Sequence, residues 1–297
     1  MIEGMVSVII ATYHRNESLK KALISLGCQS YGLTEVVVVD DNANAEWNQK
    51  VDEIIKNFRK EFPNFRIVYI VNEKNLGSAK TRNLGVENSN GEYVTFLDDD
   101  DEYLPDKIKN QFGFMMENQL DYSVTDLDLY YDNGKLAEHK TREYIRKKDR
   151  KSLMEYHFMH HITGTDTMMF KKDYFIKIGG FAPIDVGDEF YLMQRAIEHE
   201  GKFGYLPTCD VRAIIHTVDE GLSSGEGKIK GENQLYEHKK KFFNQMSRKN
   251  RRYIKMRHWA VLAFAEKRRG RKFKFIGYGI KAFLIAPIAS VKMIMKR

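Results

Sequence analysis

The first hundred residues alternate short apolar runs with segments in which apolar residues recur every three or four positions. The apolar runs are rich in β-branched residues, which indicates strands buried on both faces, and the other segments have the spacing of amphipathic helices. The predicted strands are 6–11, 36–39, 65–71 and 93–97, and the predicted helices are 17–26, 47–62 and 78–88. This order predicts an α/β fold with a mostly parallel central sheet and flanking helices.

Shorter elements follow in the second part of the chain. They are a helix at 105–118, strands around an Asn133-Gly134 turn within 121–140, a strand at 167–170, a helix at 189–200, and two short strands within 203–215. The glycine-rich segment 220–231 is typical of a mobile loop. Two basic helices are expected after it, at about 232–246 and 250–269.

Polar residues follow three of the predicted strands, at Tyr13-His14-Arg15, Asp40-Asp41 and Asp98–Asp101. In open parallel sheets, ligands bind beyond the carboxyl ends of the strands. Four adjacent carboxylates repel one another unless a cation or hydrogen-bond donors balance them. Oxygen ligands on a short loop suit Mg²⁺ or Mn²⁺. We therefore expect a metal site at this edge, with a solvated acidic turn as the alternative.

Charge is distributed unevenly along the chain. The 297 residues carry a net charge of +7, but residues 228–297 hold 21 Lys and Arg against three Glu, which is +18. The remaining residues are therefore acidic, and the basic segment is expected to meet an anionic partner. Cys28 and Cys209 show no metal-binding spacing, and no signal-peptide pattern is present, which favours a reducing cytoplasm.

Six motifs occur in order along the chain. They are VSVIIATYHR at 6–15, VVVVDDNA at 36–43, NLGSAKTRNLG at 75–85, GEYVTFLDDDDEYLPDK at 91–107, IGGF at 178–181 and GDEFYLMQRA at 187–196. Through them the chain resembles the family-2 glycosyltransferases with the GT-A fold, over about residues 5–245. The resemblance implies a metal-dependent, inverting transfer of a sugar from a nucleoside-diphosphate sugar to an acceptor hydroxyl.

The resemblance also implies a donor site. Its nucleotide-binding residues are expected to be Ala11, Tyr13, Arg15, Asp40, Asp41, Lys80, Arg82, Asp98 and Asp99. Asp41 would accept a hydrogen bond from the base, and Asp98 and Asp100 match the D-x-D motif. Asp98 or Asp99 would reach the ribose, and Asp100 would hold the Mn²⁺ or Mg²⁺ ion. His216 is a further candidate metal ligand near the diphosphate, with a structural histidine as the equal alternative.

The catalytic base implied by the resemblance belongs to the pair Asp188-Glu189. The family usually shows Glu-Asp, with an Arg six residues after the Asp, and here the order is reversed. Counting back from Arg195 favours Glu189, whereas counting from Gly187 favours Asp188. We prefer Asp188 slightly, and either carboxylate can take the acceptor's proton. A helix N-cap is the structural alternative.

We expect a glycosyltransferase domain at 1–245, with a nucleotide-binding part at 1–104 and an acceptor part at 105–245, and a basic helical tail at 246–297. The tail's longest apolar run has ten residues, at 282–291, which is too short to span a bilayer. A helix lying on an anionic membrane, at the inner face of the cell membrane, fits this pattern. A partner-binding helix, or docking on the acidic part of the chain, is the alternative.

The donor is expected to be a UDP-sugar, and the acceptor a saccharide or lipid-linked saccharide in cell-surface polysaccharide synthesis. One alternative is a sugar nucleotidyltransferase, but the first strand runs into Ala-Thr-Tyr-His-Arg and not into a glycine-rich loop. Another is a non-enzymatic protein that binds membrane or nucleic acid through its tail. The acidic remainder of the chain argues against that alternative, so nucleic acid is not an expected partner.

Overall fold

The computed structural model describes residues 1–184, 187–215 and 225–295. These residues form two compact units. The larger unit comprises residues 1–150, 162–183 and 188–215. Of the described residues, the smaller unit contains 151–161, 184, 187 and 225–295, most of which are helical.

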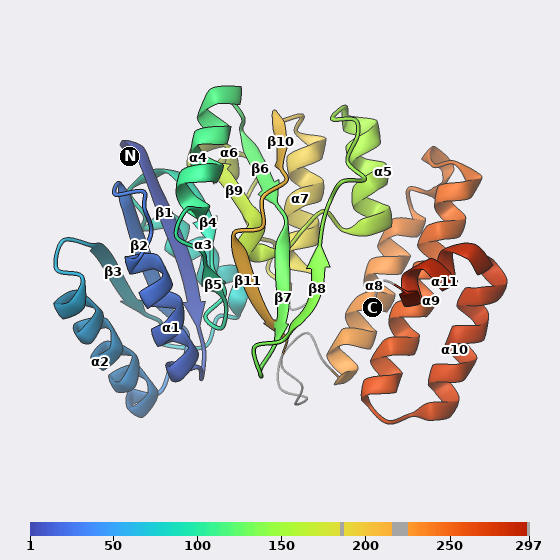
Figure 1. Cartoon of the computed structure of the whole chain (residues 1–297), viewed down its shortest axis with the longest axis horizontal. Coiled ribbons are helices and arrows are strands. Elements are labelled where there is room, and N and C mark those ends of the chain that lie inside the picture. The colour runs from blue at the N-terminus through green and yellow to red at the C-terminus, as the bar shows by residue number, and fades with distance from the viewer. Residues whose placement is uncertain (185–186, 216–224, 296–297) are drawn as a thin grey trace. The chain divides into compact units, whose positions relative to one another are not determined.

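The larger unit is built on a seven-stranded sheet (Figure 1). Its strands are β1 (Ile2–Thr12), β2 (Thr34–Asp40), β3 (Arg66–Val71), β4 (Gly91–Phe96), β6 (Tyr122–Thr125), β9 (Met168–Lys171) and β10 (Phe203–Leu206). Their order is β10-β6-β9-β4-β1-β2-β3, and β9 alone of these runs antiparallel to its neighbours β4 and β6. The predicted mostly parallel sheet is therefore confirmed.

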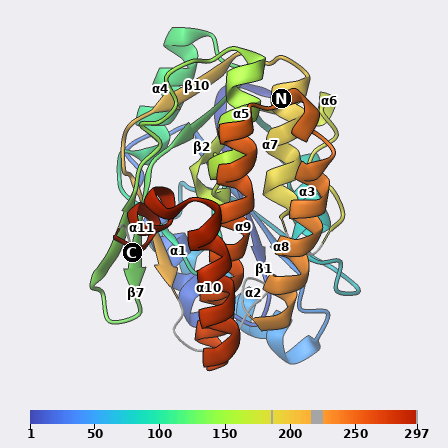
Figure 2. The same ribbon diagram turned by 90° about the vertical axis from the view of Figure 1, so that its right-hand side faces the viewer.

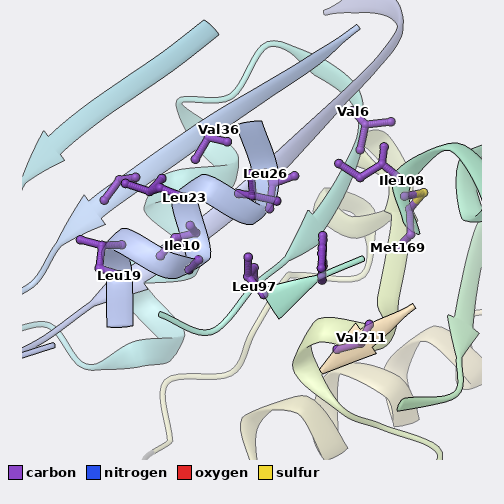
Figure 3. Close-up of a cluster of buried hydrophobic side chains, with 14 of the residues drawn as sticks. Val6, Ile10, Leu19, Leu23, Leu26, Val36, Leu97, Ile108, Met169 and Val211 are labelled. Atoms are coloured by element: carbon purple, nitrogen blue, oxygen red, sulfur yellow. The ribbon is translucent and has the colours of Figure 1, made fainter. Parts of the chain in front are cut away.

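Helices cover the sheet, and all but the shortest of them lie where the 3.6-residue pattern predicts a helix. They are α1 (Asn16–Gly27), α2 (Ala45–Glu61), α3 (Ser78–Glu87), α4 (Lys107–Asn118), α6 (Lys172–Lys177) and α7 (Asp188–Glu198). Figure 3 shows the buried face of α1, where Leu19 and Leu23 pack near Ile10 of β1. Helix α3 lies so close to β1 that a Cβ on Gly85 would sit 2.5 Å from Ile9 Cγ2. These helices fix how the loops at the carboxyl ends of the strands are arranged.

A second sheet of four strands belongs to the same unit. Its order is β5-β11-β7-β8, from β5 (Glu102–Tyr103), β11 (Val211–Ile215), β7 (Leu127–Tyr131) and β8 (Leu136–Lys140). The predicted turn is confirmed, because β7 and β8 pair antiparallel around Gly134, which has a φ of +77°. Strand β5 directly follows the acidic segment Asp98–Asp101, so this sheet anchors one end of that segment.

In the described residues of the smaller unit after 225, consecutive helices pack against one another (Figure 2). They are α8 (Gly225–Lys240), α9 (Arg248–Arg268), α10 (Lys272–Ile285) and α11 (Pro287–Met295). Most of α5 (Arg150–His160) belongs to it as well. Among the described residues, no helix is both long and apolar enough to cross a membrane.

One part of the smaller unit differs from the sequence prediction. Residues 225–231 were expected in a glycine-rich loop, and they form the first turns of α8. Packing of α8 against α9, in which Leu235 is buried, outweighs the low helix propensity of the glycines. The preceding part of the expected loop lies outside the described residues.

Candidate active site

The carboxyl ends of β1 and β4 meet through a buried carboxylate. Asp99 follows β4, and its Oδ2 accepts hydrogen bonds from the Thr12 hydroxyl at 2.8 Å and from the Tyr13 backbone N–H at 3.2 Å. Next to it, Arg15 forms an ion pair with Asp100. Burial raises the pKa of Asp99 to about 6. The strand ends that the sequence predicted to converge therefore lie in direct contact.

The end of β2 uses its two carboxylates to hold neighbouring segments. Asp41 accepts hydrogen bonds from the Asn72 side chain at 2.7 Å and from the Gly77 backbone N–H at 2.9 Å. Asp40 is fully buried and accepts a bond from the Tyr69 hydroxyl at 2.8 Å. Asp41 thus orders the loop that leads into α3, and Asp40 ties the end of β2 to β3.

Aromatic rings form a row at the same edge. The rings of Tyr13 and His14 stack with centroids 4.0 Å apart, and His14 stacks on Trp47 at 4.5 Å. His14 has a φ of +55°, and its N–H donates to Asn42 Oδ1 at 2.7 Å, which fixes the turn after β1. Tyr13 is 48% exposed and Ala11, before it, is partly buried. The row offers an open flat surface of the kind on which a base ring stacks.

A buried arginine links the acidic segment to α7. Arg82 on α3 donates from Nη2 to Asp98 Oδ1 at 2.6 Å and from Nη1 to Asp188 Oδ2 at 3.1 Å. The side chain of Arg82 is 11% exposed, so its charge compensates two carboxylates with little screening by solvent. Lys80 on the same helix is exposed. The structure thus connects Arg82, Asp98 and Asp188 and leaves Lys80 outside this network.

Two carboxylates of the acidic segment form a cluster with a third carboxylate from elsewhere in the chain. One oxygen each from Asp98, Asp101 and Asp166 lies within 4.8 Å of the others. Asp166 Oδ1 accepts the Asp98 backbone N–H at 2.6 Å, and Asp101 Oδ1 accepts the Ile214 N–H at 2.8 Å. Burial and the neighbouring carboxylate of Asp98 raise the pKa of Asp166 to about 7. The pKa of Asp101 is raised for the same reasons, with burial and Asp166 the largest causes.

This oxygen-only set fits a hard divalent cation, because a cation would relieve the repulsion that raises these pKa values. Asp100, the expected metal ligand, is on the same turn but pairs with Arg15. Asp166 was not among the candidates from the sequence. It lies in a 3₁₀ turn (Thr165–Thr167) before β9, and its only sequence signal is an acidic residue beside an apolar strand. His216 lies outside the described residues.

The two candidate bases begin α7. Both oxygens of Asp188 are engaged, because Oδ2 accepts from Arg82 and Oδ1 accepts the Glu189 backbone N–H at 3.0 Å. Burial raises the pKa of Asp188 to about 8, with the carboxylate of Glu189 adding to the rise and Arg82 opposing it. Asp188 is buried, whereas Glu189 is only partly buried.

A mostly parallel sheet with an acidic turn at its carboxyl edge, linked to a carboxylate pair on a neighbouring helix, is the arrangement that the motif resemblance to the GT-A sugar transferases implies. The family model described as glycosyl transferase family 2 matches residues 7–178, and the chain belongs to this family. It is therefore a glycosyltransferase, as the sequence motifs predicted.

Relatives agree with this assignment. An uncharacterized glycosyltransferase of Methanocaldococcus jannaschii is 33% identical over 227 residues, 75% of each chain. The putative teichuronic acid biosynthesis glycosyltransferase TuaG of Bacillus subtilis is 32% identical over 130 residues, which cover 44% of this chain and 49% of TuaG. WfgD of Escherichia coli, a UDP-Glc:α-D-GlcNAc-diphosphoundecaprenol β-1,3-glucosyltransferase, is 26% identical over 134 residues, 45% of this chain and 50% of WfgD.

Solved structures share the fold. S. aureus TarS in complex with UDP-GlcNAc superposes with a TM-score of 0.62 at 16% identity, covering 94% of this chain and 91% of that one. The mannosyltransferase PcManGT of Pyrobaculum calidifontis, in complex with GDP-Man and Mn²⁺, gives a TM-score of 0.60 at 15% identity, covering 98% and 78%. The predicted GT-A architecture is thereby confirmed.

Proposed function

We propose that this glycosyltransferase is metal-dependent and inverting, and that it moves a sugar from a UDP-sugar to a hydroxyl of a saccharide or lipid-linked acceptor during cell-surface polysaccharide synthesis. The observation that carries the proposal is the chain of contacts from the acidic segment through Arg82 to Asp188. These contacts link the expected donor site to the pair of candidate catalytic bases. The UDP donor and the lipid-linked acceptor are supported by the activity of the relative WfgD and by the UDP-GlcNAc complex of TarS.

In the proposed donor complex, the base ring lies against Tyr13 and near Asp41, and the ribose reaches Asp98 or Asp99. Arg15 exchanges its bond with Asp100 for one with the diphosphate, because an arginine fork binds phosphate oxygens well. Lys80 is exposed on α3 and can approach the same phosphates from solvent.

A Mn²⁺ or Mg²⁺ ion held by Asp98 and Asp100 would neutralise charge on the leaving diphosphate. His216 stays a candidate third ligand. Two further carboxylates hold this turn in place. Asp166 accepts the Asp98 backbone N–H, and Asp101 accepts the Ile214 N–H.

The acceptor hydroxyl loses its proton to a carboxylate as its oxygen bonds to the anomeric carbon, and the bond from that carbon to the diphosphate oxygen breaks. The nucleoside diphosphate leaves with the bonding electron pair, through an oxocarbenium-like transition state. We assign the base role to Glu189, because both oxygens of Asp188 already accept hydrogen bonds. Asp188 then positions Arg82. This proposal differs from the slight preference for Asp188 drawn from the sequence.

The test is a calorimetric titration with UDP, GDP, ADP and CDP, with and without Mn²⁺. Wild type is expected to bind UDP only with the metal, and Asp100→Ala is expected to lose this binding. Glu53→Ala, at an exposed acid on α2, is the matched control and should bind as wild type does. Absence of diphosphate binding with any metal would refute the donor site, and metal-dependent binding of another diphosphate would refute only the UDP assignment.

We also propose that the tail contacts an anionic membrane. Helices α10 and α11 pack on α9 through a small apolar cluster of Met256, Ala260 and Ala282. Their other faces leave large apolar side chains exposed, which are Phe273, Ile276, Ile280, Phe283, Leu284, Ile288 and Val291. Phe273 is 91% exposed and Ile288 76%. Exposed apolar residues among many lysines and arginines are typical of helices that lie in a membrane interface.

A further inference from the structure

A second cluster of metal-ligating side chains lies on the four-stranded sheet. Asp128 is on β7, His139 is on β8, and Cys209 is in the loop between β10 and β11. One ligand atom of each lies within 4.8 Å of the other two. His139 Nδ1 is 2.5 Å from Asp128 Oδ1 and 3.6 Å from Cys209 Sγ. The three side chains therefore face one common point.

The backbone of this sheet holds the three residues in place. Asp128 and His139 are direct partners across the antiparallel pair β7–β8. Cys209 comes three residues before Arg212, which pairs with Asp128 between β11 and β7. The loop of Cys209 is also tied to β7, because the Asp126 N–H donates to the Thr208 carbonyl oxygen at 3.0 Å. Ordinary sheet pairing thus brings together ligands from three separate segments.

We propose that Asp128, His139 and Cys209 form a Zn²⁺ site with a fourth position open to solvent. A thiolate, an imidazole and a carboxylate are the side chains that bind zinc in proteins, whereas Mg²⁺ and Mn²⁺ prefer oxygen ligands. Around tetrahedral zinc, neighbouring ligand atoms are separated by roughly 3.3–3.6 Å. The distance of 3.6 Å between Cys209 Sγ and His139 Nδ1 already has this value.

The contact between His139 and Asp128 must lengthen, from 2.5 Å by roughly 0.8 Å. The His139 side chain is 54% exposed, so its ring can turn by this amount without displacing packed neighbours. The same exposure leaves the fourth coordination position accessible to water.

A nucleophilic triad of Cys, His and Asp is the competing interpretation, and the geometry argues against it. In such a triad the histidine takes the nucleophile's proton on one ring nitrogen and donates from the other to the acid. Here Asp128 and Cys209 both face Nδ1 of His139, so the ring cannot connect them in this way. Convergence on one nitrogen is instead the arrangement expected of ligands around a cation.

A zinc ion bound by His139 and Cys209 would link the edge strand β8 to the loop that precedes β11. Strand β11 in turn holds the acidic segment, because the Ile214 N–H donates to Asp101. The ion would therefore stabilise the sheet that supports the donor edge. The inference does not depend on the proposed donor or acceptor.

The first experiment titrates the metal-stripped full-length chain with Co²⁺ and follows the thiolate-to-cobalt charge-transfer absorption. Wild type and Cys28→Ser are expected to develop this absorption and to lose it when Zn²⁺ is added. Cys209→Ser is expected to show none, and its affinity for Zn²⁺ should fall by about 10–100-fold or more. Cys28 is the matched control, because it is the chain's other cysteine and is exposed.

A second measurement needs no variant and remains decisive if Cys209→Ser folds poorly. Wild type is alkylated with iodoacetamide, and the modification of each cysteine is followed by mass spectrometry. Zn²⁺ is expected to slow alkylation of Cys209 and not of Cys28, and Mg²⁺ is expected to slow neither. Equal alkylation of Cys209 with and without Zn²⁺, or cobalt absorption that persists in Cys209→Ser, would overturn the proposal.

Discussion

Arg82 is the residue on which the candidate site depends most. It is a buried cation between Asp98 of the acidic segment and Asp188 of α7, and it compensates both. Removing one member of a buried ion pair leaves an uncompensated charge, which costs far more than an exposed pair would. Arg82 is therefore a direct link between the acidic segment and the carboxylate pair at the start of α7.

The first residue-scale prediction separates the roles of the two candidate bases. Glu189→Gln is expected to lower kcat by about 10²–10⁴-fold, because a general base is lost, with donor binding unchanged. Asp188→Asn keeps a single oxygen acceptor, for either Arg82 or the Glu189 N–H, but leaves the Glu189 carboxylate in place, and is therefore expected to lower kcat less. The measurement is the transfer rate with the donor found by titration, beside calorimetric affinity for the diphosphate. A loss confined to Asp188→Asn would assign the base role to Asp188.

The second residue-scale prediction concerns stability and pH. Burial and Asp98 raise the pKa of Asp166 from 3.8 to about 7, so the folded state binds a proton there more tightly than the unfolded chain does. The stability from this proton is fully present below about pH 4 and is lost as pH rises through about 7. Asp166→Asn keeps an oxygen for the Asp98 N–H and removes the titration.

Relative to wild type, Asp166→Asn is therefore expected to gain stability between pH 5 and pH 8, on the order of 1–3 kcal/mol. Urea unfolding of both proteins across this range, in the absence of divalent metal, measures the difference. Asp173→Asn, at an exposed acid on α6, is the control and should follow wild type. A difference between Asp166→Asn and wild type that does not change with pH would contradict the assigned pKa.

At the scale of elements, the helices and strands that the sequence predicted best are those with a long and regular hydrophobic pattern. The strands β1 to β4 and the helices α1 to α3 were predicted to within a few residues, because each is a long apolar run or a regular amphipathic repeat. The two-residue strand β5 and the six-residue helix α6 were not predicted, because neither is long enough to show a period.

Local sequence patterns also explain why the acidic segment of the candidate site was predicted and Asp166 was not. The acidic segment is visible in the sequence because its carboxylates are adjacent and follow a strand. Asp166 is 65 residues beyond Asp101 and reaches Asp98 only because β9 inserts antiparallel between β4 and β6. Sheet order depends on packing of the whole unit, and no local pattern reports it.

At the scale of the whole molecule, charge and exposed apolar surface coincide in the sequence after residue 228. This segment carries +18, and its last two helices hold the exposed apolar side chains. Each lysine or arginine near an anionic bilayer contributes about 1 kcal/mol, and each apolar side chain that enters the interface adds to this. Both contributions come from the same segment of the chain, and together they would favour the proposed membrane attachment.

The resulting prediction is that the full-length chain binds vesicles of phosphatidylglycerol and phosphatidylcholine more tightly than vesicles of phosphatidylcholine alone, and less tightly as salt is raised. Phe273→Ser, Leu284→Ser and Ile288→Ser combined are expected to weaken binding by about tenfold or more, since apolar insertion is lost. The matched control is Met116→Ser, Leu136→Ser and Ile176→Ser, which removes exposed apolar residues of the larger unit. Vesicle co-sedimentation measures all three proteins, and equal binding by the two triple variants would refute membrane contact through α10 and α11.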